Sequence, residues 1–465
     1  MKKLLIVKVD GIGDYVLFRN FLEDIVNSEK YADYELSLLA KAEVADMAEI
    51  LDSKYIEKFY KFDQESYQRS RWYSYSLIQK LNRSGFDAVL YPTYSRDFAV
   101  DTLINQLKAD EKVGFCSDLS NISAENRETG DGYYTTLIDV GHDKIPEFER
   151  NRLFFGALLG KDADKLLPEI RFKSDFELPF KDFVVLSLGA KTPKRRYSPV
   201  KYAAALNHII DKYNLNVVLL AGGDVCEDAL YLEKHIRKKE NLINLISATS
   251  IRDSLEIIAG AELLISNDTG ISHISVAMGV KTIVLSNGNH FGRFCPYPDF
   301  INDRYVLITP FDYSTDRKKF IDRYYSGSEL NIHSVNEDEV IKSLDRMLPD
   351  RTYEPVLFEN EIVCEKMFFS HKYSIFFQQL EGLRDRVSRY ILYGNGSVGK
   401  TVEALLKEQV LGCVDINDEN NHPMTLAERD FDKVIITVLG REKEITEFLV
   451  NKVRIPAEKI VTFEL

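Results

Sequence analysis

The sequence has few of the residues that mark disulfide-rich, metal-binding or membrane-spanning proteins. Among its 465 residues are five cysteines with no Cys-x-x-Cys spacing, namely Cys116, Cys226, Cys295, Cys364 and Cys413. An odd number of scattered cysteines indicates neither a disulfide framework nor a zinc site, and we expect no metal. No run approaches the roughly 20 apolar residues that span a bilayer, and the apolar start is too short for a signal peptide. We therefore expect a cytoplasmic protein, with at most peripheral contact at the inner face of the cytoplasmic membrane.

An excess of positive charge is also missing. The formal net charge of −13 argues against a general nucleic-acid binder, which would carry a basic surface. It leaves room for a local basic pocket that holds a phosphorylated ligand. The sequence has no repeat of solenoid period. With 45% hydrophobic and 29% charged residues, the chain has the composition of an ordinary globular protein of roughly three domains.

Strand and helix patterns alternate along most of the chain. The apolar run 3–9 ends in Asp10-Gly11-Ile12-Gly13-Asp14, and residues 15–26 have a helical pattern. A second series starts at residues 183–188, after the polar, proline-containing segment 171–182. Alternation of this kind predicts parallel α/β sheets. Two such series in succession predict two Rossmann-like domains that face a cleft, with ligands at the carboxyl ends of the strands.

This reading divides the chain into four parts. We expect an N-terminal Rossmann-like domain over residues 1–175 and a second one over 176–350. A linker with a helical segment then covers 351–388, and a small Rossmann-like module covers 389–465. Within the first domain, the aromatic-rich stretch 60–82 predicts a surface helix with connecting loops. Residues 117–132 have the composition of an exposed loop.

The most informative motif is Asp268-Thr269-Gly270, which lies between an apolar run and an amphipathic segment over 271–278. A small-residue turn at a helix N-terminus presents free backbone N–H groups to an anion, which the helix dipole also favours. Asp268 beside such a site could accept hydrogen bonds from hydroxyl groups. A site that binds a phosphate next to a polyol would suit a nucleotide-sugar. The alternative is that Asp268 only caps the helix of an ordinary βαβ unit.

Two further motifs follow strands. In Gly11-Ile12-Gly13-Asp14, the glycines allow a tight turn and close approach of a ligand. Asp14 could then act as general base on a hydroxyl, or it could simply complement the helix dipole. The loop 189–199 carries four basic residues, Lys191, Lys194, Arg195 and Arg196. Such a loop suits a diphosphate, because Arg binds phosphate oxygens bidentately and Lys adds a point charge, although charge runs are often solvated faces.

Together these motifs resemble the heptosyltransferase family, which transfers heptose from ADP-heptose to lipopolysaccharide. LLIVKVDGIGD is similar to the family's N-terminal signature. GAKTPKRRYSP is similar to the middle one, with Tyr197 where Trp is common and Ser198 inserted before Pro199. Residues 245–289 resemble the third signature closely, and the resemblance extends over about residues 1–350.

The resemblance implies an inverting, metal-independent glycosyltransferase of two-domain GT-B architecture. It implies that Asp14 is the base and that Arg195 meets the charge on the leaving group. It assigns donor binding to Gly13, Lys194, Arg196, Asp268, Thr269, Gly270 and His273. The substrates implied are a nucleotide-diphosphate-sugar, which could be ADP-linked, and a glycan or lipid-linked glycan acceptor of the bacterial surface. No cofactor is expected.

The sequence departs from the family just after the third signature. Arg293 and Pro296-Tyr297 keep the pattern, but Asn287, Gly288 and Asn289 alter the pocket wall. The donor sugar therefore need not be a heptose, nor the base adenine.

The C-terminal part carries the glycine motif 394–399, in which Gly394, Gly396 and Gly399 follow the apolar run 390–393. Asp415 lies near the position where an acidic residue binds a ribose hydroxyl. The part is long enough for only half of a dinucleotide fold. We therefore favour a nucleotide-binding or structural module over an NAD-dependent dehydrogenase. The alternatives for the whole chain are a nucleotide-sugar-modifying enzyme that uses this module, and a non-catalytic nucleotide-sugar-binding protein.

Overall fold

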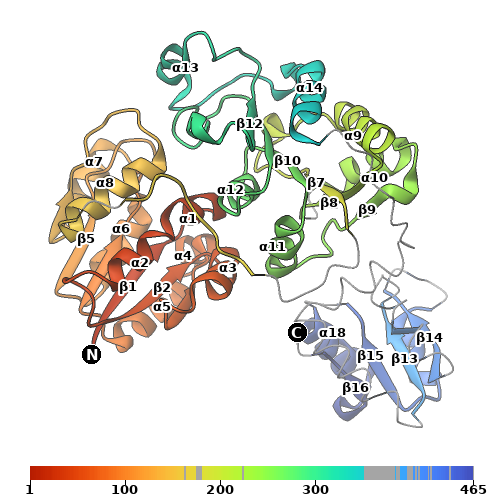
Figure 1. Ribbon diagram of the computed structural model, residues 1–465. Helices are drawn as coiled ribbons and strands as arrows, with labels where there is room; N and C mark the ends of the chain where they lie inside the picture. The colour runs from red at the N-terminus through yellow and green to blue at the C-terminus, as the bar shows by residue number, and fades with distance from the viewer. Residues whose placement is uncertain are drawn as a thin grey trace. The chain divides into compact units, whose positions relative to one another are not determined.

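The computed structural model describes residues 1–161, 164–173, 181–222, 225–349, 383, 388–394, 399, 402–403, 406, 409–416, 418, 421–438 and 441–463. The chain forms two compact units, Met1–Met367 and Phe368–Leu465. Within the described residues, the first unit contains two six-stranded sheets and the second a four-stranded one (Figure 1). The expected boundaries at 175/176 and 350/351 fall outside the described residues, as does most of the linker 351–388. These boundaries stay predictions.

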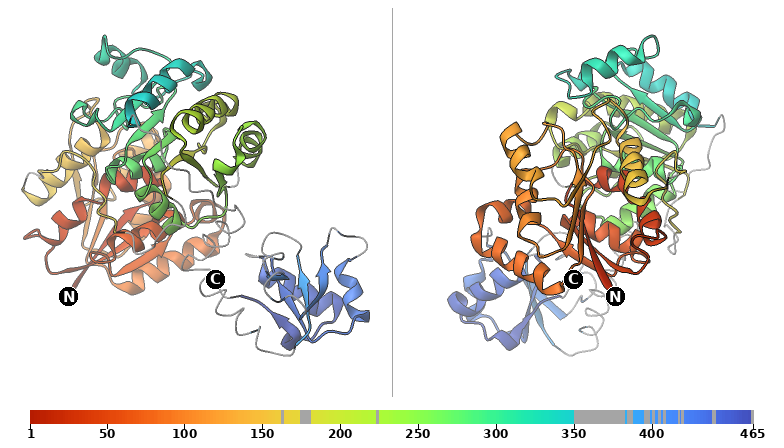
Figure 2. Two further views of the ribbon diagram at one scale, coloured as in Figure 1. Left: turned by 45° about the vertical axis from the view of Figure 1, so that its right-hand side comes forward. Right: turned by 90° about the vertical axis from the view of Figure 1, so that its left-hand side faces the viewer.

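The first sheet is parallel and has the strand order β3-β2-β1-β4-β5-β6. Its strands are β1 (Lys2–Lys8), β2 (Tyr34–Ala40), β3 (Lys58–Lys61), β4 (Ala88–Tyr91), β5 (Glu111–Phe115) and β6 (Thr136–Ile138). The helices between and after them are α1 (Ile12–Phe18), α2 (Phe21–Val26), α3 (Ala42–Asp52), α4 (Gln64–Arg69), α5 (Arg71–Ser84), α6 (Phe98–Gln106), α7 (Ala124–Asp131) and α8 (Glu147–Leu159). Helices cover both faces of the sheet (Figure 2), which explains why the central strand is apolar at successive positions.

Two local predictions for this domain were wrong. The helix expected over 15–26 is two helices, separated at Arg19 and Asn20. Arg19 is buried there, and its guanidinium binds the Asp52 carboxylate (Nη2–Oδ1 2.6 Å) and the carbonyl of Glu169 (2.6 Å). The loop expected over 117–132 ends in helix α7, which begins because the Ser123 hydroxyl accepts a hydrogen bond from the Asn126 N–H at 3.2 Å.

The second sheet has the order β12-β11-β10-β7-β8-β9 and is also parallel. Its strands are β7 (Phe183–Ser187), β8 (Asn216–Leu220), β9 (Leu242–Asn244), β10 (Leu263–Asn267), β11 (Thr282–Leu285) and β12 (Tyr305–Ile308). Its helices are α9 (Pro199–Tyr213), α10 (Cys226–His235), α11 (Ile251–Ala259), α12 (Gly270–Ala277), α13 (Arg317–Tyr324) and α14 (Glu337–Met347). The strand, turn, helix and strand expected around Asp268 are therefore present as β10, α12 and β11.

Both sheets reverse their strand order at one point. In the first sheet, the reversal lies between β1 and β4, and in the second between β7 and β10. Ligands of Rossmann-like sheets bind beyond the carboxyl ends of the strands at this point. Helix α1 follows β1, and helix α12 follows β10, so each domain presents a helix N-terminus at its own switch point.

The second unit contains a small parallel sheet with the order β14-β13-β15-β16. Its strands are β13 (Tyr390–Tyr393), β14 (Val410–Val414), β15 (Lys433–Ile436) and β16 (Ile460–Val461), with helix α18 (Glu442–Phe448) packed nearby. The predicted third α/β module is thus observed.

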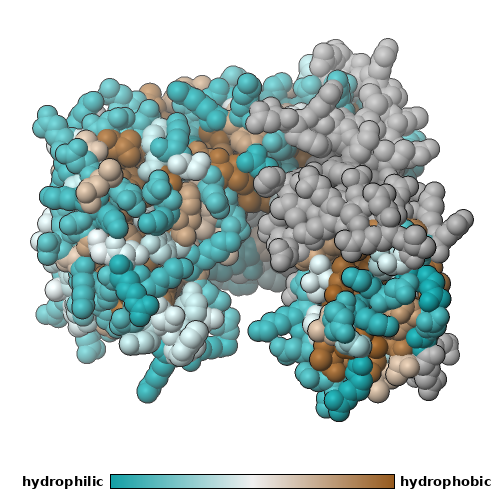
Figure 3. Space-filling model, turned by 90° about the horizontal axis from the view of Figure 1, so that it is seen from below, coloured by the Kyte–Doolittle hydropathy of each residue, from teal (hydrophilic) through white to brown (hydrophobic). Residues whose placement is uncertain are grey.

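The described residues contain no helix that is long and apolar enough to cross a membrane. On the part of the surface seen in Figure 3, hydrophilic side chains predominate on the first unit, with apolar ones scattered between them.

Candidate active site

The two domains of the first unit meet where helices α1 and α12 begin, and the two helices lie side by side (Figure 1). A Cβ atom on Gly13 would lie 2.8 Å from Cδ2 of His273 and 3.5 Å from Cα of Gly270. A Cβ atom on Gly270 would lie 2.9 Å from Cβ of Ile12 and 3.1 Å from the backbone nitrogen of Gly13. Only glycine at these two positions allows so close an approach. The contact sets the geometry of the cleft.

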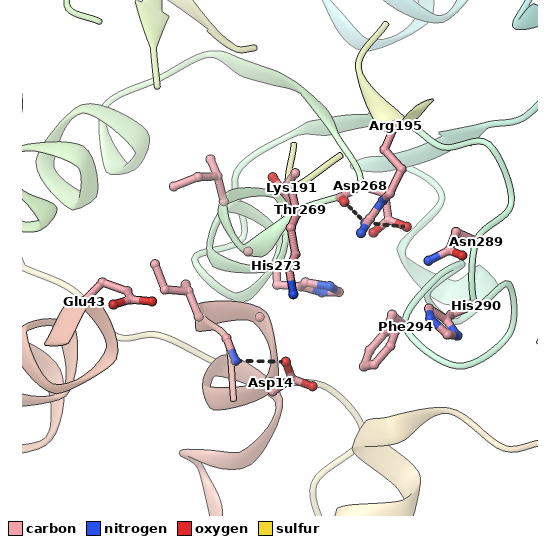
Figure 4. A pocket seen from close by; sticks show the side chains of 15 residues that line it. Asp14, Glu43, Lys191, Arg195, Asp268, Thr269, His273, Asn289, His290 and Phe294 are labelled. Carbon is pink, nitrogen blue, oxygen red and sulfur yellow. Dashed lines mark hydrogen bonds and ion pairs between the residues drawn. The ribbon is translucent and has the colours of Figure 1, made fainter. Parts of the chain in front are cut away.

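A pocket of about 370 Å³, called the first pocket below, opens beside this contact. It is lined by Gly11, Ile12, Gly13, Asp14, Glu43, Lys191, Arg195, Asp268, Thr269, Gly270, Ile271, His273, Asn289, His290 and Phe294. Figure 4 shows Asp14 on the α1 side and Arg195 with Asp268 on the opposite side. The structure therefore brings together seven of the predicted site residues, namely Gly13, Asp14, Arg195, Asp268, Thr269, Gly270 and His273.

Two predicted basic residues lie elsewhere. Lys194 is paired with the Glu329 carboxylate and is 68% exposed, and the Arg196 Nε donates to the carbonyl of Ala190 at 3.0 Å. Neither lines the first pocket. The loop forms a 3₁₀ turn, η1 (Pro193–Arg195), and neighbouring side chains on such a tight turn point in different directions. The cations that reach the first pocket are Lys191 and Arg195.

Arg195 contacts Asp268 across the pocket wall. Its Nη2 donates to the backbone carbonyl of Asp268 and lies 3.7 Å from the carboxylate Oδ2. The hydroxyl of Ser286 donates to the same oxygen at 3.3 Å, and Asp268 is buried. Helix α12 begins directly afterwards, with Thr269 as its N-cap. The Thr269 N–H donates to the Ser272 hydroxyl at 3.4 Å. The next N–H groups, those of Gly270 and Ile271, have no partner within the helix, so this wall offers N–H donors beside a guanidinium.

His273 lies one turn into α12 and is buried. Its Nδ1 is 2.8 Å from the hydroxyl of Tyr297, and Phe294 packs edge-on against the ring. Burial lowers the pKa of His273, so the imidazole is neutral at pH 7. A neutral imidazole has one donor and one acceptor nitrogen. When the Tyr297 hydroxyl donates to Nδ1, the proton is on Nε2.

A second pocket of about 480 Å³ adjoins the first. The two share five lining residues, Gly11, Asp14, Lys191, His290 and Phe294. The other walls are mostly polar and come from Val9, Asp10, Lys41, Gln64, Tyr91, Thr93, Ser95, Asp97, Val100, Ser120, Asn121, Glu147 and Arg293. Asp14 therefore lies at the junction of two pockets. Of the aromatic stretch 60–82, only Gln64 belongs to this lining.

Two carboxylates near this junction have opposite electrostatic environments. Burial, with the negative charge of Asp10, raises the pKa of Asp14 to about 6. Burial works in the same direction on Asp10, but the Lys8 ammonium at 2.7 Å and the Thr93 hydroxyl at 2.7 Å outweigh it, and the pKa of Asp10 is lowered. One carboxylate is thus held ionised while its neighbour can take a proton near neutral pH. Pairs whose pKa values are pushed apart are typical of acid–base sites.

Contacts between the domains close the far side of the second pocket. Arg293 Nε donates to the carboxylate of Glu147, in α8, at 2.8 Å, and the Glu147 N–H donates to the Arg293 carbonyl at 2.7 Å. Burial would lower the pKa of Arg293, but the charge of Glu147 raises it. The hydroxyl of Tyr325 donates to the carbonyl of Ile145 at 2.6 Å. No motif marks Glu147 in the sequence, whereas Asp10 and Arg293 belong to patterned segments and could have been found there.

In the second unit, the two described glycines of the glycine motif leave no room for a side chain. Gly394 has a φ of +107°, and a Cβ on it would lie 2.5 Å from a methyl group of Val438. A Cβ on Gly399 would overlap the carbonyl oxygen of Gly394. The N–H of Asp415 donates to the carbonyl of Asn421 at 3.1 Å. Gly396 lies outside the described residues. A nucleotide or NAD site in this unit stays a prediction.

Within the described residues, no group of three or more His, Cys, Asp or Glu side chains is arranged to hold a metal ion.

One protein-family model matches part of this chain. Residues 74–304 match the model of glycosyltransferase family 9 (heptosyltransferase), a span that includes Arg195 and Asp268 but not Asp14. No curated protein is significantly similar in sequence to this chain.

Solved structures match over about three quarters of the chain. The glycosyl transferase family 9 protein of Veillonella parvula has 15% sequence identity and a TM-score of 0.58, and covers 74% of this chain and 97% of its own. E. coli heptosyltransferase WaaC with ADP has 13% identity and a TM-score of 0.59, and covers 74% of this chain and 100% of its own. E. coli ADP-heptose LPS heptosyltransferase II has 15% identity and a TM-score of 0.56, and covers 75% and 98%.

These matches confirm the predicted α/β fold with two Rossmann-like domains in a GT-B arrangement. The third, smaller parallel sheet of the predicted fold class is present in the structure itself. The family-model match over residues 74–304 confirms the family resemblance seen in the sequence. The protein is heptosyltransferase-like and carries a glycosyltransferase family 9 domain.

Proposed function

We propose that this protein transfers a sugar from a nucleotide-diphosphate-sugar to a hydroxyl of a glycan acceptor, with inversion and without a metal. One observation carries the proposal. Asp14, with its raised pKa, lies where the two pockets join, and cations with a helix N-terminus form the opposite wall. A base and an anion-binding wall on either side of one cleft are the groups that such a displacement needs.

The first pocket takes the donor in this proposal. Its diphosphate binds the N–H group of Gly270 and, in place of the Ser272 hydroxyl, that of Thr269. Arg195 and Lys191 are the cations. The buried carboxylate of Asp268 accepts hydrogen bonds from sugar hydroxyls. His273 donates from Nε2 toward the diphosphate or the turn. The related E. coli heptosyltransferase WaaC has been solved with ADP and with ADP-2-deoxy-2-fluoro heptose, which supports an ADP-linked donor here.

The chemical step is a single displacement at the anomeric carbon. The acceptor O–H bond breaks and its proton passes to the Asp14 carboxylate, while the acceptor oxygen forms the new bond to the anomeric carbon. The bond from that carbon to the diphosphate oxygen breaks, and its electron pair leaves with the nucleoside diphosphate. Arg195 and the α12 N–H groups stabilise the growing negative charge. Because attack and departure occur on opposite faces of the carbon, the configuration inverts.

The second pocket takes the acceptor, because Asp14 faces both pockets and the rest of this lining is rich in hydroxyl and amide groups. One related structure is an ADP-heptose LPS heptosyltransferase. We therefore propose a bacterial surface glycan or lipopolysaccharide as acceptor, approached at the inner face of the cytoplasmic membrane.

A panel of ADP-, UDP- and GDP-sugars tests this function. We expect one donor to raise the melting temperature of the wild type and to be slowly hydrolysed, with release of the nucleoside diphosphate. Asp14→Asn should bind that donor as the wild type does but release diphosphate at least about 100-fold more slowly, as expected for loss of a general base. Asp33→Asn, which removes an exposed carboxylate of the same domain, is the matched control. Full activity in Asp14→Asn would refute the assignment of the base, and failure of every donor to bind would refute the function.

A further inference from the structure

One of the two carboxylate oxygens of Asp10 makes hydrogen bonds to other residues of the fold. Its Oδ2 accepts hydrogen bonds from the ammonium of Lys8 and from the hydroxyl of Thr93, each at 2.7 Å. Among the described residues, no side chain or backbone group is hydrogen-bonded to its Oδ1. The side chain is 23% exposed, and the exposed part belongs to the second pocket. Asp10 therefore presents an ionised oxygen to this pocket.

The need to neutralise Lys8 explains only one of the two carboxylate oxygens of Asp10. Lys8 is only 3% exposed and needs a counter-charge, because an unpaired buried ammonium is costly. The Oδ2 atom alone meets that need. An ionised carboxylate has about four acceptor positions, and those on Oδ1 are open to a ligand. The neighbouring lining contains Thr93, Ser95, Ser120 and Asn121, which suit the hydroxyl groups of a sugar.

Asp10 and Asp14 occupy different places in the cleft. Asp14 lines both pockets, whereas Asp10 lines only the second. The two carboxylates are close, because the N–H of Gly11, next to Asp10, donates to Oδ2 of Asp14 at 3.3 Å. An acceptor whose attacking hydroxyl reaches Asp14 therefore has room to reach Asp10 with a second hydroxyl in the same pocket.

We infer that Asp10 binds the acceptor through a second hydroxyl next to the attacking one, so that the acceptor is a sugar with a vicinal diol at its reacting end. The inference rests on the proposed function and names the acceptor class of the same site. The carboxylate accepts a hydrogen bond from the second hydroxyl and thereby orients the first toward Asp14. A carboxylate or phosphate of the acceptor at that position would be repelled by Asp10.

The experiment measures binding of simple sugars to the ADP-loaded protein by saturation-transfer NMR. The probes are methyl α-mannoside, methyl α-glucoside and methyl α-galactoside, with the mono-deoxy analogues of whichever glycoside binds. In the wild type, removal of the hydroxyl that meets Asp10 should weaken binding about tenfold or more, as expected for a hydrogen bond to a charged group. In Asp10→Asn, which keeps a carbonyl oxygen for Lys8 and Thr93, the same deoxy analogue should bind within about twofold of its parent.

The matched control is Asp14→Asn, in which the penalty for losing the second hydroxyl should persist. If Asp10→Asn does not fold, binding of the mono-deoxy glycosides to the wild type tests the inference by itself. Equal binding of all deoxy analogues to the ADP-loaded wild type would overturn the inference, as would an equal penalty in Asp10→Asn or binding of no glycoside. If the wild type does not bind ADP, the proposed function fails and the inference with it, which distinguishes the two failures.

Discussion

Replacement of Asp14 by Asn is expected to stabilise the protein while it slows transfer at least about 100-fold. Burial and the charge of Asp10 raise the pKa of Asp14 from its ordinary value of 3.8 to about 6 in the folded protein. The folded state therefore binds the proton more tightly than the unfolded state does. Below pH 3.8 the carboxyl is neutral in both states and has no such cost. Between pH 3.8 and 6 the folded state keeps a proton that the unfolded state has lost, so the cost grows with pH. Above pH 6 the carboxylate is ionised in both states and the cost is constant.

The size of the effect follows from the shift. A difference of about two units corresponds to about 3 kcal/mol at pH 7, at roughly 1.4 kcal/mol per unit, and this is an upper bound for the gain in Asp14→Asn. About half of it should remain at pH 5. The first unit spans Met1–Met367, and with an unfolding entropy of about 2 cal/mol/K per residue each kcal/mol raises its melting temperature by roughly 1.3 °C. The variant should therefore melt up to about 4 °C higher at pH 7.5.

Scanning calorimetry between pH 4.5 and 8 measures this difference. The transition of the first unit is identified as the one that ADP shifts, and Asp33→Asn controls for the loss of one negative charge from the same domain. The gap between Asp14→Asn and the wild type should grow from pH 4.5 to about 6.5 and then stay level. A gap that is independent of pH, or a variant less stable than the wild type at pH 7.5, would show that the environment of Asp14 does not disfavour its charge.

Three further predictions concern the same cleft. The rate of nucleoside diphosphate release should be half-maximal near pH 6 and fall about tenfold per unit below it, because Asp14 must be ionised to act as base. Arg195→Gln should lower kcat by roughly 100- to 1000-fold, the usual cost of one donor to a developing anion. Lys194→Gln, outside the first pocket, should stay within about twofold, and equal losses would show that Lys194 also binds the donor. Gly270→Ala should cost about 1–3 kcal/mol through overpacking against Ile12 and slow transfer at least tenfold, whereas Gly132→Ala, where a Cβ would lie 3.4 Å from its nearest neighbour, should do neither in melting and kinetic assays.

The sequence predicted those features of the fold that depend on neighbouring residues. The alternation of apolar runs with amphipathic segments predicted the parallel sheets, and the small-residue turns placed Asp14 and Asp268 at the starts of helices. The break at Arg19 was missed because it depends on Asp52, a residue more than thirty positions away. Helix α7 was missed because its polar composition resembles that of a loop, although Ser123 is a good N-cap residue.

For the candidate site, the sequence by itself determined which loops contribute, because turn chemistry and periodicity are local. The tertiary structure alone decided which side chains of those loops face the cleft. The turn at Pro193–Arg195 brings Arg195 to the first pocket, which Lys191 also lines, and directs Lys194 to Glu329. The tertiary structure also decided the electrostatics of the site. The raised pKa of Asp14 arises from burial and from the negative charge of Asp10. That charge is held in place by Lys8 and Thr93. Such effects depend on distances across the fold, and those distances exist only once the strands and domains have come together.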